Sequence, residues 1–388
     1  MKKRNIMKTL FAGTMTLGMA LSVSPAFAKE VQEGTENNPA ELWLAKELNI
    51  ANGVTLGDTD FKFIFTQTGY NNGAPSTNYQ VPIDPTLTVS SNDKTDSKNV
   101  LENVKFPAAG VYTYTVSEDQ TGDKGAEEYG MDYSNAKYTV NVYVKNKENS
   151  QETYVYSVTV NQNKNDQGED VTSPDTGKVD PNPTPGDDTG DDSEFRFVNT
   201  YTKKAEGTID PDNPDNKLAL LISKKVTGQY GDKTRGFTFN VKIKLPDTAD
   251  KTNIYTGTVE DIEYQFSHNN DTEVTLSDGQ SLKFEDLPVG TTYDVAEVAT
   301  IDYQPSAIVT ENGIEGTETI GTMSEALTIT NKKVGESSNK AAFTNDYNDE
   351  DVATPTGIFI NNLPFVLMVV VAGSGLALYV VSKRRSHQ

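Results

Sequence analysis

The sequence contains no cysteine, two histidines and one tryptophan among its 388 residues. The absence of cysteine excludes disulfide frameworks, thiolate catalysis and cysteine-ligated zinc or iron–sulfur sites. Two histidines leave little for a histidine-rich metal centre or a Ser-His-Asp triad, so we expect no cofactor and no metal. Positive charge is also scarce, with 34 Lys and Arg against 56 Asp and Glu. Nucleic acid is therefore excluded as a partner, because phosphate binding needs clustered Lys and Arg.

Long apolar runs lie at the two ends of the chain. Residues 1–28 combine a basic start, an apolar stretch and an Ala-Phe-Ala cleavage site at 26–28. This arrangement predicts a secretory signal peptide. Residues 353–388 contain the pentapeptide Ala-Thr-Pro-Thr-Gly, an apolar run over 363–381 and a basic tail. The run is long enough to cross a bilayer, and the tail would remain on the cytoplasmic side.

The order of pentapeptide, apolar run and basic tail resembles the cell-wall sorting signal of Gram-positive surface proteins. In that family a sortase cuts between Thr and Gly and joins the Thr to an amine, which here implies cleavage between Thr356 and Gly357. The resemblance also implies a transient membrane intermediate and attachment to peptidoglycan at the extracellular surface. The usual motif is Leu-Pro-x-Thr-Gly, but Pro355 lies one place later, as in a variant of some pilin subunits. Which sortase acts therefore stays open.

Between these ends the pattern is typical of an all-β protein. Alternating β-branched and aromatic runs are separated by clusters of Gly, Pro, Asn and Asp, which indicates short strands and turns. The clearest runs are residues 61–65, 111–116, 138–144, 153–160, 237–245 and 293–298. Short strands with these turn signals predict β-sandwiches of the immunoglobulin type.

An internal repeat indicates two such domains. Tyr-x-Val-x-Glu occurs in both copies, and each copy ends in a Phe-x-Asn-x-Tyr segment, at 197–201 and 343–347. We predict a first domain over 39–203, a linker over 204–216 and a second domain over 217–348. The first copy is longer by about the length of residues 161–192. That stretch is rich in Pro, Asp and Gly and poor in apolar residues, so we expect a low-complexity insertion that cannot order itself.

Each copy carries a Lys and a Glu on strand faces that are otherwise apolar. Lys46 shares a face with Leu42, Leu44 and Leu48. Burial lowers the pKa of a Lys and raises that of a Glu, which favours a neutral amine nucleophile beside a proton-donating acid. An Asn on the last strand of each copy supplies an amide carbon. Attack by the amine would release ammonia and leave a Lys–Asn isopeptide bond, with the Glu relaying protons.

This pattern resembles the backbone pilins of Gram-positive pili, specifically the two-domain streptococcal FctA-like pilins with Cna B-type domains. In that family, the first and last strands of each domain lie side by side and are joined Lys to Asn. Carried over residue by residue, the resemblance implies a bonded pair and a catalytic Glu in each domain: Lys46, Asn199 and Glu118, then Lys224, Asn345 and Glu297. Asn331 is a competing acceptor in the second domain.

The resemblance implies a structural subunit of a covalent fibre rather than an enzyme, apart from the single-turnover formation of its own bonds. In the family, a sortase joins the sorting-signal Thr of one copy to a Lys near the end of the first domain of the next. Lys178 is the first candidate for this lysine and Lys164 the second. A monomeric, sortase-anchored adhesin with the same domains is the alternative, and in either case a host receptor is a possible partner.

Overall fold

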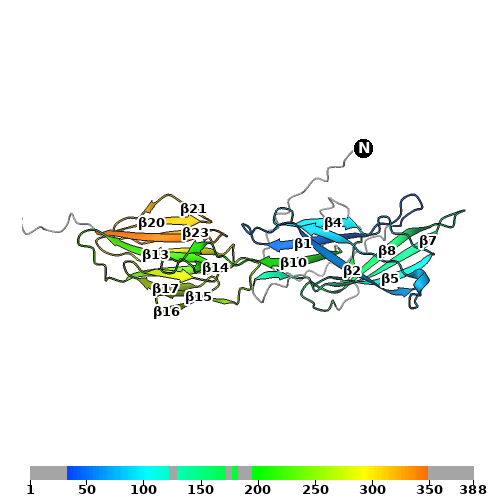
Figure 1. Ribbon diagram of the computed structural model, residues 1–388, viewed down its shortest axis with the longest axis horizontal. Helices are drawn as coiled ribbons and strands as arrows, with labels where there is room; N and C mark the ends of the chain where they lie inside the picture. Colours follow the sequence, from blue (N-terminus) through cyan, green and yellow to red (C-terminus); the bar gives the residue numbers. More distant parts are fainter. Residues whose placement is uncertain (1–32, 122–128, 172–176, 182–194, 348–388) are drawn as a thin grey trace, which may run out of the picture.

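The computed structural model describes residues 33–121, 129–171, 177–181 and 195–347 (Figure 1). Over these ranges the chain is all-β, which confirms the predicted class; its single helical element is the 3₁₀ turn Thr77–Tyr79. No helix in these ranges is long and apolar enough to span a membrane. The predicted signal peptide and sorting signal, including Thr356 and Gly357, lie outside the described residues.

The first ten strands build one unit of two sheets. One sheet has the order β4-β1-β10-β6, and the other has the order β3-β2-β5-β7-β8-β9. The strand bounds are β1 Trp43–Ile50, β2 Thr59–Tyr70, β3 Thr86–Val89, β4 Thr95–Asn99, β5 Gly110–Glu118, β6 Gly130–Asp132, β7 Lys137–Asn146, β8 Thr153–Lys164, β9 Lys178–Val179 and β10 Arg196–Thr202. The rings of Phe63 on β2 and Phe197 on β10 lie 5.0 Å apart, so the two sheets face each other across a shared core.

A second unit repeats this plan. Its central sheets have the orders β18-β13-β24-β20 and β17-β14-β19-β23, with β15-β16 and β21-β22 extending the first of them. The bounds are β13 Leu220–Thr227, β14 Phe237–Lys244, β15 Ile254–Val259, β16 Ile262–Ser267, β17 Asp271–Leu276, β18 Ser281–Phe284, β19 Thr292–Glu297, β20 Tyr303–Glu311, β21 Ile314–Glu315, β22 Thr319–Ile320, β23 Leu327–Lys333 and β24 Lys340–Tyr347. Phe239 and Phe343 pack across the sheets with ring centroids 5.2 Å apart.

In both units the first strand pairs in parallel with the last. β1 lies beside β10, with Leu48 opposite Asn199, and β13 lies beside β24, with Val226 opposite Asn345. Side chains alternate between the two faces of a strand. The face of β1 that carries Leu44 and Leu48 therefore also turns Lys46 into the core, where these side chains are buried.

Part of the segment 161–192 is ordered, contrary to our expectation. β8 continues to Lys164, and β9 pairs with it so that Lys178 lies opposite Asn161. The amide of Val171 also donates to the carbonyl of Asn163 over 2.9 Å. A strand at a sheet edge offers unpaired backbone groups, so a polar segment can be held by main-chain hydrogen bonds without apolar side chains.

The two units lie end to end (Figure 1). Residues 204–216, expected as a linker, include β11 (Thr208–Ile209), which pairs with β12 (Lys217–Leu218). At the junction, Thr202 Oγ1 donates to the carbonyl of Thr248 over 2.7 Å, and Lys203 pairs with Glu336 at 2.9 Å. Polar contacts of this kind orient one unit on the other.

Candidate functional site: two buried Lys–Glu–Asn clusters

In the first unit, three polar side chains meet inside the core. Lys46 comes from β1, Asn199 from β10 and Glu118 from the end of β5 in the facing sheet. Lys46 Nζ lies 2.8 Å from Glu118 Oε1, and Asn199 Nδ2 donates to the same oxygen over 2.9 Å. Lys46 is 1% exposed, Glu118 is 4% exposed and Asn199 is 0% exposed. One carboxyl oxygen thus holds the amine and the amide together, away from water.

The second unit contains an equivalent cluster. Lys224 on β13 lies 2.8 Å from Glu297 Oε1 at the end of β19, and Asn345 Nδ2 on β24 donates to that oxygen over 2.5 Å. All three residues are buried. Since the two units share their strand order, residues of equivalent strands bring the same chemical groups together twice.

Burial shifts the protonation equilibria of both clusters in the same direction. Desolvation lowers the pKa of Lys46 from 10.5 to about 8, although the neighbouring Glu118 opposes the shift. The pKa of Lys224 falls to about 8 for the same reason, with Glu297 opposing it. Desolvation also raises the pKa of Glu118, again against the effect of the paired lysine. Removing charges from water penalises each ionised form, so transfer of one proton within the pair yields a neutral amine and a neutral acid.

Aromatic rings complete the surroundings of each amine. Lys46 Nζ lies 4.6 Å from the ring centre of Phe61, and Lys224 Nζ lies 4.3 Å from that of Phe237. The rings exclude water and leave the carboxyl group as the partner that accepts and returns protons. The arrangement therefore contains an amine nucleophile, an acid–base group and an amide with a potential ammonia leaving group within contact distance.

The two clusters differ at the amide oxygen of the Asn. The backbone amide of Ser134, between β6 and β7, donates to Asn199 Oδ1 over 2.7 Å and also lies 3.1 Å from Glu118 Oε2. In the second cluster, Asn345 Oδ1 and Glu297 Oε2 are buried without a hydrogen-bond partner among the described residues. Sequence reasoning missed Ser134, because a backbone donor leaves no side-chain signature in the sequence.

The remaining candidate residues lie away from the clusters. Asn331 is exposed on β23, and its amide donates to Asp294 Oδ1 over 2.7 Å. Lys178 is exposed on the edge strand β9, whereas Lys164 forms an ion pair with Asp170 at 2.7 Å. No group of three or more carboxylate or imidazole side chains suited to a metal ion occurs in the part of the chain that the structure describes.

Fold and clusters together define a class of protein: two tandem β-sandwiches, each with a buried Lys, Glu and Asn linking its first and last strands to the facing sheet. Comparison with protein-family models agrees with this description. Residues 42–202 match the model of the Spy0128-like isopeptide containing domain, FctA. Residues 218–347 match a domain of unknown function. The resemblance to FctA-like pilins is thus confirmed.

Similarity to individual proteins extends over most of the chain. A pilin of Streptococcus pyogenes serotype M1 is 26% identical over 380 residues, covering 92% of this chain and 95% of its own. The pilus tip adhesin Cpa of Streptococcus pyogenes is 31% identical over 144 residues, which cover 36% of this chain and 18% of the adhesin. The crystal structure of the major pilin from Streptococcus pyogenes aligns with 80% of this chain and 99% of its own, at 21% identity and a TM-score of 0.33.

Proposed function

We propose that this protein is the structural subunit of a covalently polymerised, cell-wall-anchored surface pilus. Its two immunoglobulin-like, Cna B-type domains, over 39–203 and 217–348, would each carry a self-made isopeptide bond. The observation that carries the proposal is the buried contact of one Glu oxygen with both a Lys amine and an Asn amide, found once in each unit. Similarity to a streptococcal pilin over 92% of the chain supports the fibre role.

The bond-forming step starts from the neutral pair in the first domain. The amine of Lys46 attacks the side-chain amide carbon of Asn199, which forms a C–N bond and moves the carbonyl electron pair onto oxygen. Glu118 delivers its proton to the leaving nitrogen and takes one from the attacking nitrogen. The carbonyl then re-forms, the original C–N bond breaks and one ammonia leaves. Glu118 ends the cycle in its starting state, and Lys224, Glu297 and Asn345 act in the same way in the second domain.

Bond formation would also relieve the cost of the buried groups. An amide carries no charge, so the desolvation penalty on the ionised lysine and glutamate disappears once ammonia has left. The product joins the first strand of each domain to its last. A link at that position lies across the strands that a pulling force along the fibre would shear, and it slows unfolding, which sets the lifetime of an extracellular protein.

Subunits would be joined to one another by a sortase. In our proposal, Thr356 of one copy is transferred from Gly357 to the amine of Lys178 on the next copy, and the last copy is transferred to peptidoglycan. Lys178 is favoured because its side chain is exposed on β9, whereas Lys164 is engaged by Asp170. A monomeric anchored adhesin remains the second candidate, favoured by the local match to a pilus tip adhesin. An immunoblot of cell-wall extracts separates the two, since a fibre gives a ladder of SDS-resistant species and an adhesin gives one band.

Intact mass spectrometry of the recombinant ectodomain tests the chemistry directly. Each bond lowers the mass by about 17 Da, because one ammonia leaves per amine attack. The wild-type chain should therefore show two such decrements. Glu118→Ala and Glu297→Ala should each restore one of them, and the double variant should have the full sequence mass. A wild-type mass equal to that of the sequence would refute the proposal.

A further inference from the structure

We propose that the backbone amide of Ser134 is an oxyanion donor for bond formation in the first domain, that Asp166 holds it in place, and that the first bond therefore forms faster than the second. This inference rests on the isopeptide chemistry proposed above. It starts from the asymmetry between the clusters: Asn199 Oδ1 accepts a hydrogen bond from Ser134, while Asn345 Oδ1 has no partner among the described residues.

The contact lies at the atom where charge develops. When Lys46 attacks Asn199, the carbonyl oxygen acquires negative charge, and the Ser134 N–H already donates to it over 2.7 Å. Ser134 is 2% exposed, so the interaction acts away from water. A fixed donor in a site of low dielectric stabilises such a charge without reorganisation, and losing one donor of this kind typically costs about 100- to 1,000-fold in rate.

Asp166 fixes the position of this amide. Its Oδ1 accepts from Ser134 Oγ over 2.5 Å and from the amide of Val198 over 2.9 Å, so it joins the Ser134 loop to β10 beside Asn199. The carbonyl of Asp166 also accepts from the amide of Asn135 over 2.9 Å. Asp166 does not itself contact Asn199 Oδ1 in these hydrogen bonds; it is a positioning residue.

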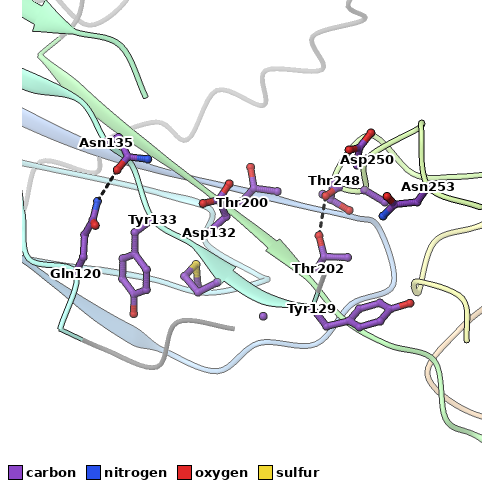
Figure 2. Close-up of a pocket in the computed structure, with 13 residues that line it drawn as sticks. Gln120, Tyr129, Asp132, Tyr133, Asn135, Thr200, Thr202, Thr248, Asp250 and Asn253 are labelled. Atoms are coloured by element: carbon purple, nitrogen blue, oxygen red, sulfur yellow. Dashed lines mark hydrogen bonds between the residues drawn. The ribbon is translucent and has the colours of Figure 1, made fainter. Parts of the chain in front are cut away.

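Gln120 also secures the loop. Its Nε2 donates to the carbonyl of Ser134 over 2.8 Å and to Asn135 Oδ1 over 3.2 Å. Figure 2 shows the Gln120–Asn135 contact at the wall of a groove of about 540 Å³ near the junction of the two units. The loop that presents the donor is thus anchored by the side chains of Asp166 and Gln120, and a donor held in this way is preorganised.

The second domain has a different strand where this loop would be. β6 has three residues before the chain turns toward β7, whereas β20 continues for nine residues alongside β24. The residue of β20 opposite Asn345 is Pro305, which has no N–H to donate. Among the described residues, no hydrogen-bond donor contacts the carbonyl oxygen of Asn345, so the developing charge lacks the support that Ser134 gives in the first domain.

Time-resolved mapping of the two bonds tests this inference. The mature chain is made by cell-free synthesis, quenched in denaturant at intervals and digested, and the cross-linked peptide of each domain is quantified by mass spectrometry. In the wild type, the first bond should form at least about tenfold faster than the second. Asp166→Ala should slow the first bond about 10- to 100-fold and leave the second unchanged.

Two control variants separate positioning from general damage. Asp166→Asn keeps an oxygen acceptor for Ser134 Oγ and Val198, so it should retain a rate near that of the wild type. Glu152→Ala removes an exposed carboxylate that pairs with Lys147 at 2.9 Å on the same unit, and should change neither rate. Tryptophan fluorescence at the same times reports folding.

The possible results are distinct. Equal rates for the two wild-type bonds, or an unchanged first rate in folded Asp166→Ala, would overturn the role of Ser134 and Asp166. If Asp166→Ala does not fold, the ratio of the two wild-type rates decides the question by itself. Absence of both cross-linked peptides from the wild type would instead refute the isopeptide proposal.

Discussion

Lys46 and Glu118, 72 positions apart in the chain, meet at 2.8 Å with both side chains fully withdrawn from solvent. Lys224 and Glu297, 73 positions apart, meet at the same distance in the second unit. A buried ion pair pays a large desolvation cost and is weak support for stability by itself. The pair occurs in both units, each time beside an Asn amide. A reaction that converts the charged groups into a neutral amide explains this better than a contribution to stability.

The rate of bond formation should depend on pH with a maximum between two limits. The reactive pair carries one proton, as neutral Lys46 and protonated Glu118. Above the lowered Lys46 pKa of about 8 the pair loses that proton, so the rate should fall about tenfold per pH unit. Below the raised pKa of Glu118 the pair gains a second proton and the amine becomes a non-nucleophilic ammonium. A rate that keeps rising well above pH 8 would show that the acid is dispensable.

Loss of one bond should lower stability sharply. Asn199→Ala removes the acceptor and keeps the Lys46–Glu118 contact. The bond would close a loop of roughly 150 residues, so its loss should reduce the free energy of unfolding of the first domain by about 5 kcal/mol on loop entropy. Denaturant melts measure the difference. Asn49→Ala, which removes an exposed side-chain contact with Thr200 on the same strands, is the matched control and should change stability by less than about 1 kcal/mol.

The acceptor in the second domain should be Asn345. Asn345→Ala should abolish the second mass decrement of about 17 Da, because the amide carbon is removed. Asn331→Ala should retain both decrements, since Asn331 is exposed on β23 and forms no hydrogen bond with Lys224 or Glu297. Intact mass distinguishes the two variants, and the reverse pattern would assign the bond to Asn331.

Polymer assembly should depend on Lys178. In cells that make the protein together with its sortase, Lys178→Ala should convert the high-mass ladder to monomer, because the acceptor amine is lost. Lys164→Ala should leave the ladder intact, as should Lys147→Ala, a control for a half-buried lysine paired with Glu152 at 2.9 Å. Immunoblots of cell-wall extracts report the result. A ladder that survives Lys178→Ala and disappears with Lys164→Ala would reverse the assignment.

Most of the fold could be predicted from the sequence, because the patterns that indicate strands and turns lie within short stretches of the chain. Strand alternation with a period of two follows from backbone geometry, so it indicated which residues of 42–48 turn inward. The internal repeat indicated two units from matched spacings. The order within 161–192 was missed, because strand pairing at a sheet edge depends on main-chain hydrogen bonds that composition does not report.

By itself, the sequence determined the all-β class, the repeated Lys and Glu on inward faces, and the likeness to a pilin family. These follow from alternation and spacing, which each strand carries in its own residues. The tertiary structure alone decided which groups touch: that one carboxyl oxygen contacts both Lys46 and Asn199, and that the Ser134 amide reaches only the first of the two amides. Those contacts depend on the path of a loop between the two sheets and on backbone N–H donors. Every non-proline residue carries such a donor, so the residue type does not indicate which of them will form the contact.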